Sequence, residues 1–133
     1  MPALSAFDYA IVRVVPRVER GECINVGIIL FCRTRRFLDA RIALDPQRLA
    51  ALARDLAPDL VQSHLEVFPR VCAGGPDGGY IGLLSQAERF HWLVAPRSTI
   101  IQTSAVHSGL CTDPVAALDR LLTTLVLPVP TDD

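Results

Sequence analysis

The sequence contains no lysine, so arginine supplies all 13 of its basic residues. Against 14 acidic residues they leave a formal net charge of −1, which excludes a broadly basic nucleic-acid binder. Half of the residues are hydrophobic, which excludes a disordered chain. A GC-rich genome explains the arginine usage more simply than function does. Even so, the planar guanidinium binds carboxylate or phosphate through two parallel hydrogen bonds and keeps its charge.

Long apolar runs and a leader sequence are also missing. No run approaches the roughly 20 apolar residues that cross a bilayer, so no membrane contact is expected. The first residues include Asp8 and lack a basic start followed by an apolar segment, so no signal peptide is expected. The cysteines, Cys23, Cys32, Cys72 and Cys111, show neither Cys-x-x-Cys spacing nor the density of a disulfide scaffold. Free thiols in a reducing cytoplasm are therefore expected.

The length of 133 residues predicts one domain with a substantial core, at 1–127, followed by a proline-rich, acidic tail at 128–133 that is expected to be disordered. Asp-Pro pairs predict helices that start at 45–46 and 113–114. Pro58 predicts a helix that ends near Phe68, before Pro69. Ser85 and Glu88 form a capping box for a short helix to residue 93.

Alternating apolar residues from Tyr9 to Arg41 predict three consecutive antiparallel strands. If the first turn is centred near 19–21, residues whose numbers sum to about 40 face each other. That register places Arg13 opposite Gly27 and Val15 opposite Asn25. A fourth strand is predicted at 99–106, with a turn at 107–109. The predicted fold is therefore α+β, with an antiparallel sheet of about four strands packed against helices.

The same register predicts one covered face and one open face. Even-numbered residues such as Val26, Ile28 and Leu30 are expected to form the core beneath the helices. The other face is expected to carry five polar or aromatic side chains: Tyr9, Arg13, Asn25, Asp39 and Arg41. Apolar residues are predicted among these charges, a mixture suited to an interface. They are Tyr9, Ile11, Ile29, Phe31 and Phe37.

Metal binding and nucleophilic catalysis have little support. His107 and Cys111 form the closest His/Cys pair, but two ligands do not make a tetrahedral zinc site, so neither metal nor cofactor is expected. Ser108 or Cys111 beside His107 suggests a catalytic dyad, yet a dyad requires a hydrogen bond in space and an orienting third group.

An anion-binding edge is the strongest polar hypothesis. Arg97 lies in a Pro-Arg-Ser-Thr turn, where hydroxyls and backbone amides favour an anion. The alternative is that Arg13 pairs with Glu22 or Asp39 and that the turn hydroxyls only satisfy local backbone groups. The candidate ligand-binding residues are Arg13, Glu22, Asn25, Arg97, Ser98 and His107.

Several of these residues belong to a wider pattern, notably Tyr-x-x-x-Arg-x-x-Pro followed by Asn-Val-Gly. The full set is Tyr9, Arg13, Pro16, Arg20, Glu22, Asn25, Val26, Gly27, Arg89, Phe90, Trp92, Pro96, Arg97, His107, Gly109 and Leu118. From about Phe7 to Pro128 the chain resembles the bacterial domain-of-unknown-function family 3037. Cys23 departs from that pattern, where a larger apolar residue is expected.

The resemblance implies no established activity. It implies small cytoplasmic accessory proteins, associated loosely with neighbouring genes for HipA-type kinases. We therefore expect a non-catalytic interaction or regulatory module that binds a protein partner, such as a kinase, or a second copy of itself. The alternative is an enzyme or sensor that binds a phosphate-bearing ligand, a nucleotide or nucleic acid, through the arginine-lined edge. Nucleic acid ranks lowest because no basic stripe with interleaved aromatics is present.

Overall fold

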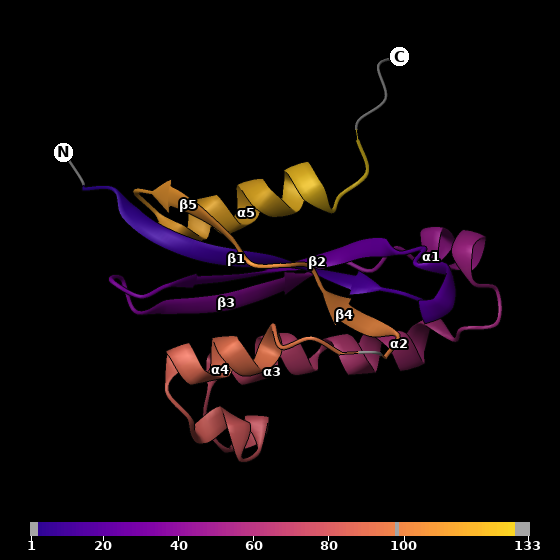
Figure 1. Ribbon diagram of the computed structural model, residues 1–133, viewed down its shortest axis with the longest axis horizontal. Helices are drawn as coiled ribbons and strands as arrows, with labels where there is room; N and C mark the ends of the chain where they lie inside the picture. Colours follow the sequence, from indigo (N-terminus) through magenta and orange to yellow (C-terminus); the bar gives the residue numbers. More distant parts are fainter. Residues whose placement is uncertain (1–2, 98, 130–133) are drawn as a thin grey trace.

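A computed structural model describes residues 3–97 and 99–129 and confirms the α+β class. A five-stranded antiparallel sheet lies between helices, with α5 on one side and α2, α3 and α4 on the other (Figure 1). In chain order the elements are β1 (Ser5–Val14), η1 (Val18–Arg20), β2 (Ile24–Cys32), β3 (Phe37–Ile42), α1 (Pro46–Leu52), α2 (Pro58–Leu65), α3 (Val67–Ala73), η2 (Pro76–Gly78), η3 (Ile81–Leu83), α4 (Gln86–Leu93), β4 (Ile101–Thr103), β5 (His107–Cys111) and α5 (Pro114–Leu125).

The predicted meander of β1, β2 and β3 is present, and two short strands complete the sheet on the far side of β1. β4 pairs with Val12–Val14 and β5 pairs with Ser5–Tyr9. Between them Ser104 Oγ accepts from the Ile11 N–H at 2.9 Å, while the Ser104 N–H donates to the Ile11 carbonyl at 2.8 Å. The hydroxyl replaces one ladder bond and interrupts the strand. The prediction of a turn at 107–109 was wrong, because β5 begins at His107.

The predicted register of the first hairpin was wrong by one residue from Asp8 to Val12 and by two at Arg13 and Val14. Val12 lies opposite Gly27, and after a bulge Arg13 lies opposite Asn25. The turn is not a short symmetric one: the η1 turn ends at Gly21, whose φ of +70° is readily adopted by glycine. Loop geometry of this kind sets the register of a hairpin and is not visible in the strand pattern.

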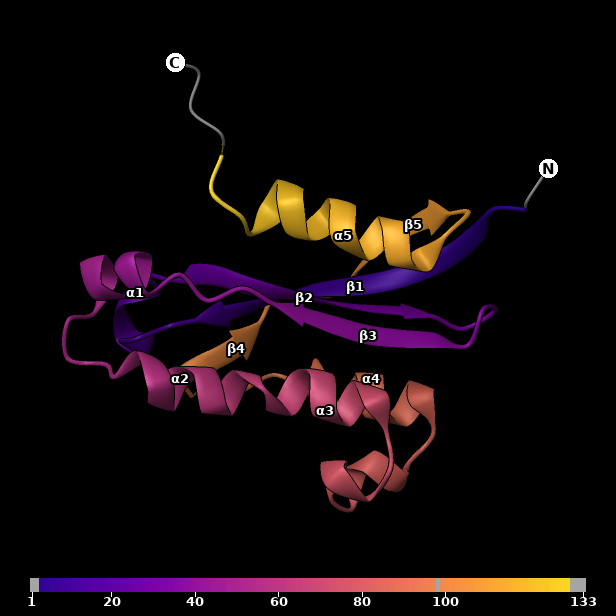
Figure 2. The same ribbon diagram turned by 180° about the vertical axis from the view of Figure 1, so that it is seen from behind.

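Helices cover both faces of the sheet, and each face carries its own core. The register shift changes which side chains share a face. A larger core lies towards α2, α3 and α4 and includes Val12, Val14, Val26, Ile29, Phe31, Leu38, Leu49, Val61, Leu65, Phe68, Phe90 and Leu93. A smaller core lies towards α5 and includes Phe7, Ile11, Ile28, Leu30, Cys32, Cys111, Ala117, Leu118 and Val126. Figure 2 shows the same layers from behind.

Two sequence predictions about these faces were therefore wrong. The even-numbered face is not the single core, because Ile28 and Leu30 belong to the smaller core and Val12 to the larger. The proposed interface set is divided, because Ile29 and Phe31 are buried on the opposite face from Ile11. An open apolar face on the central strands is thus not available to a partner.

Local signals predicted the helix starts correctly. Asp45 caps α1 and Asp113 caps α5, each followed by proline, and the Ser85/Glu88 capping box opens α4. The helix from Pro58 instead breaks at Glu66 and resumes as α3, with Pro69 in its first turn, where a missing N–H costs nothing. In the described ranges no helix is long and apolar enough to span a membrane. Residues 130–133 of the predicted tail lie outside the described residues.

Candidate functional site

Arg13 and Asn25 meet on the sheet face that α5 covers. Arg13 Nε donates to Asn25 Oδ1 at 3.2 Å, and Asn25 Nδ2 donates to the Leu125 carbonyl at 3.1 Å. Arg48 Nη1 donates to the next carbonyl, that of Val126, at 3.0 Å. Carbonyls at a helix C-terminus carry partial negative charge and lack partners within the helix. This cluster therefore anchors the end of α5 to β2.

Replacing Asn25 with alanine is expected to lower the free energy of unfolding by about 1–2 kcal/mol, because it removes two partly buried hydrogen bonds, one to the Leu125 carbonyl and one from Arg13. Urea unfolding followed by circular dichroism measures this change. Glu22→Gln is the control, because it removes only an exposed ion pair and is expected to leave the midpoint unchanged. Equal midpoints for the two variants would show that Asn25 does not hold α5.

Glu22 does not join the Arg13 cluster. Its carboxylate pairs with Arg20 on the exposed first hairpin. The hydrogen bond from Arg20, followed by its charge, lowers the pKa of the Glu22 carboxyl. The two side chains line a polar hollow of about 220 Å³ together with Pro16, Arg17, Ala51 and Leu52.

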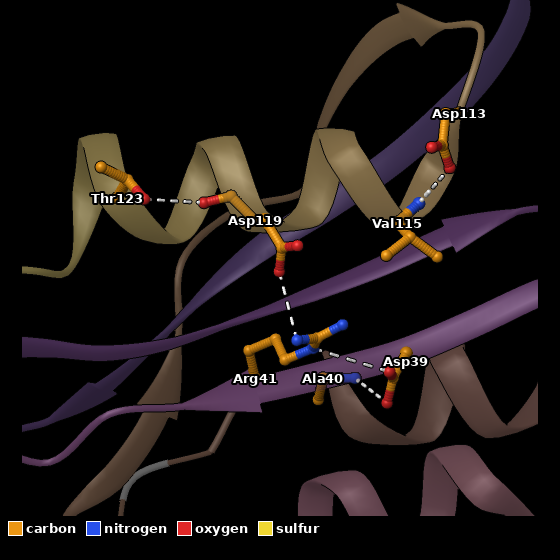
Figure 3. A network of polar contacts seen from close by, with 7 residues as sticks. All are labelled: Asp39, Ala40, Arg41, Asp113, Val115, Asp119 and Thr123. Carbon is orange, nitrogen blue, oxygen red and sulfur yellow. Dashed lines mark hydrogen bonds and ion pairs between the residues drawn. The ribbon is translucent and has the colours of Figure 1, made fainter.

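Asp39 does not pair with Arg13 either. Arg41 Nη1 lies 3.2 Å from Asp119 Oδ1, and its Nε lies 3.8 Å from Asp39 Oδ2, which links β3 to α5 (Figure 3). These side chains are half exposed, so the ion pairs contribute at most about 1 kcal/mol. The predicted sharing of a face by Arg13, Asn25, Asp39 and Arg41 is found, but α5 covers the face on which they lie.

His107 begins β5 and its ring lies 5.5 Å from that of Tyr9, measured between centroids. The Ser108 hydroxyl donates to Asp8 Oδ1 at 2.8 Å, and Cys111 is buried in the smaller core. In the part of the chain that the structure describes, no hydrogen bond joins His107 to either residue. Across the same residues no three His, Cys, Asp or Glu side chains cluster as metal ligands would. His107 therefore does not form the dyad with Ser108 or Cys111 that the sequence suggested.

Cys72 is a second buried cysteine, and its pKa is also informative about reactivity. Burial, followed by the nearby charge of Asp39, raises its pKa to about 12. Such a thiol stays protonated at neutral pH and is a poor nucleophile. Cys72 therefore fits a structural role in the larger core.

Arg97 lies on the other side of the sheet from Arg13, at the end of α4. Its Nη1 donates to the Leu93 carbonyl at 2.9 Å and its Nη2 to the Trp92 carbonyl at 2.8 Å. The guanidinium carbon lies 4.9 Å from the centroid of the Trp92 ring, a cation–π distance. Burial lowers the pKa of Arg97, although a guanidinium stays charged in proteins. Ser98, the adjacent predicted ligand, lies outside the described residues.

A cleft of about 290 Å³ opens beside Arg97. Its walls come from the end of α2, the start of α3, the end of α4 and the approach to β4, and β4 lies beside α2 in Figures 1 and 2. The lining residues are His64, Val67, Phe68, Trp92, Leu93, Arg97, Thr99, Ile100 and Ile101. The wall is mainly apolar, and its polar side chains are a histidine, an arginine and a threonine. This combination accepts an apolar group with a polar or charged end.

The sequence did not predict this cleft. Its lining residues are spread from His64 to Ile101, and only the tertiary fold brings α2, α3, α4 and β4 around one cleft. Of the five predicted ligand residues that the structure describes, only Arg97 lines it, so these five are not brought into one site. Trp92, the sole tryptophan of the chain, gave no signal by its sequence alone, because its 39% exposure, unusual for a tryptophan, is visible only in the structure.

Comparison with known proteins identifies the family. A family model described as Protein of unknown function (DUF3037) matches residues 9–126. No curated protein and no solved structure matches the chain. The matched range starts within β1 and ends just past α5, so it includes both the Asn25 cluster and the Arg97 cleft. The resemblance seen in the sequence is confirmed: this chain belongs to the DUF3037 family.

Proposed function

We propose that this protein is a non-catalytic interaction module that holds a segment of a partner protein in the Arg97 cleft. The observation that carries this proposal is the lining: apolar side chains and a partly exposed Trp92 surround one arginine. Exposed tryptophan beside arginine is the composition of binding hot spots. Among the described lining residues the one hydroxyl, that of Thr99, donates to the Ile101 carbonyl and is not paired with His64, which favours binding over turnover.

We place this role in the cytoplasm, which the four unpaired cysteines of the chain favour. A HipA-type kinase is the first partner to test, because the family resemblance implies that association. A second copy of the chain is another occupant, and sedimentation of the purified protein tests that arrangement directly. A phosphate-bearing ligand at Arg97 is the second candidate function, favoured by the absence of any carboxylate on this arginine within residues 3–97 and 99–129.

Crosslinking from the rim of the cleft is expected to identify the partner. A photoreactive benzoylphenylalanine at His64, which is exposed and lines the cleft, should give a discrete adduct in the native host. The same group at Leu60 is the matched control, because Leu60 is exposed on the same helix but does not line the cleft. Equal adducts from both positions would count against the cleft as the contact surface.

The identified partner is then purified and its affinity measured by calorimetry. Thr99→Trp places a large ring at the exposed mouth of the cleft and is expected to weaken binding at least about 10-fold by blocking access. Leu60→Trp adds the same ring outside the cleft and should bind like the wild type. Unchanged affinity of the Thr99→Trp variant would overturn the proposed function.

A further inference from the structure

The cleft carries the positive charge of Arg97, and no acidic side chain among its described lining residues balances this charge. Arg97 is the only arginine among the described lining residues, and none of them is an aspartate or a glutamate. Arg41 of β3, which is also half-buried, lies against two carboxylates, whereas Arg97 has none in the described part of the chain. A partly desolvated guanidinium gains most from an anionic partner. The missing counter-charge points to a ligand that supplies it.

The guanidinium of Arg97 is also held in place before any ligand arrives. Its hydrogen bonds to Trp92 and Leu93 use two of the five N–H donors that an arginine carries. Stacking on the Trp92 ring fixes the plane of the fork. Because the group is already oriented, a ligand loses little side-chain entropy when it binds to the remaining donors.

The size of the cleft limits the apolar part of the ligand. Sites for cofactors and drug-sized molecules range from about 300 to 1,000 Å³. This cleft, at about 290 Å³, lies just below that range. Its mainly apolar wall suits an aliphatic side chain against Phe68, Leu93 and Ile101 better than the polar sugar and phosphates of a nucleotide. A carboxylate next to an aliphatic side chain therefore matches both the wall and the charge.

We propose that the cleft recognises a peptide in which an aliphatic side chain is followed by an acidic residue, with the carboxylate paired to Arg97. This inference rests on the proposed function, because it names the chemistry of the partner segment. The aliphatic side chain of the peptide packs against the apolar wall formed by residues of α3, α4 and β4. The carboxylate stays at the rim, where Arg97 offers its free donors and where Thr99 lies nearby.

Trp92 gives a direct measurement, because it is the sole tryptophan of the chain and lines the cleft. The probes are three blocked tetrapeptides: acetyl-Ala-Leu-Asp-Ala-amide, its Asp→Asn form and its Leu→Ser form. The wild-type protein is titrated with each peptide while tryptophan fluorescence is recorded. The Asp peptide is expected to bind about 10-fold more tightly than the Asn peptide, as a charge-assisted hydrogen bond predicts. The Ser peptide is expected to bind at least as weakly as the Asn peptide.

Two variants test whether Arg97 is responsible. Arg97→Gln should reduce the Asp/Asn preference to about 1, since the fork then offers no charge. Arg70→Gln is the matched control, because it removes one exposed arginine of α3 outside the cleft and should keep the preference. If Arg97→Gln unfolds, Arg97→Lys serves instead and should keep the charge but weaken the preference, because it lacks the bidentate fork.

Several outcomes would overturn the inference. They are equal binding of the Asp and Asn peptides to the wild type, a preference that survives in Arg97→Gln, and no binding of any peptide. A fluorescence response to adenosine monophosphate but not to the Asp peptide would overturn it in favour of a phosphate-bearing ligand. None of these results bears on partner crosslinking at His64 or blocking at Thr99, so failure of this inference and failure of the proposed function are separable.

Discussion

Replacing Arg89 with alanine is expected to lower the free energy of unfolding by roughly 3 kcal/mol, since three backbone carbonyls lose their charged donor. Arg89 is only 9% exposed. It donates to the carbonyls of Val71 at 2.9 Å, Cys72 at 2.7 Å and Leu84 at 3.0 Å. These bonds join the end of α3 to the loop before α4.

Arg89 acts as a C-terminal cap from another element. The last carbonyls of α3 have no intrahelical partners, and a positive charge beside them is favourable. The guanidinium also packs against Gly74, where an added Cβ would lie 2.8 Å from Nη1, so the loop closes tightly over the arginine. Without that side chain the Cys72 and Leu84 carbonyls would lose their donor, at a cost of about 1 kcal/mol or more each, and the Val71 carbonyl would keep only the Gly74 N–H at 3.1 Å.

Urea unfolding of Arg89→Ala and Arg70→Ala provides the comparison. The Arg70 side chain is exposed on α3 and makes no hydrogen bond or ion pair with the described residues. Its removal should therefore change the free energy of unfolding by less than about 0.5 kcal/mol. Arg89→Lys is expected to fall between them, because one ammonium cannot replace a fork that reaches three acceptors. A loss for Arg89→Ala as small as that for Arg70→Ala would show that water can satisfy these carbonyls.

The second large effect is expected at Gly27, where alanine should destabilise the protein by about 2–3 kcal/mol through overpacking. A Cβ at this position would lie 2.6 Å from Ile42 Cδ1 and 2.7 Å from the Arg41 carbonyl oxygen. The isoleucine methyl can rotate away, but the carbonyl belongs to β3, which pairs with β2 at this point. Relief therefore requires the two strands to separate.

This expectation opposes the ordinary trend, in which alanine in place of a strand glycine stabilises the folded state. Gly78→Ala is the control, because its Cβ would meet nothing closer than 3.5 Å, an ordinary contact. Thermal unfolding should show a clearly lower melting temperature for Gly27→Ala and nearly the wild-type value for Gly78→Ala. A double variant with Ile42→Ala should lose less stability than the sum of the single losses, because it removes one of the two clashes.

Arg89 and Gly27 both belong to the family pattern, but the sequence did not show what either residue does in the fold. Gly27 was expected to lie opposite Arg13, but it lies opposite Val12 and Ile42, and its missing side chain allows β3 to approach. Arg89 occupies a short helix with a clear capping box, and nothing in its sequence neighbourhood indicates burial. Its acceptors lie on α3 and before α4, so only packing identifies them.

The Asn25 cluster was predicted in part. The meeting of Arg13 and Asn25 is found, although through a register different from the expected one. The bulge between the Val12 and Arg13 pairs keeps both side chains on the same face after the one-residue shift. Bond formation by Asn25 to α5 depends on a helix 100 residues away, which no local pattern specifies.

By itself the sequence determined the α+β class, the meander and the helix starts. Caps at Asp45, Ser85 and Asp113 act within one turn of the chain, and strand alternation is a property of neighbouring residues. The tertiary structure alone decided the register, the covering of both sheet faces and the Arg97 cleft. A one-residue change in pairing reverses which side chains share a face, and its cause is the geometry of a turn and a bulge. The cleft is lined by residues of α2, α3, α4 and β4, so its chemistry depends on how the fold brings these distant segments together.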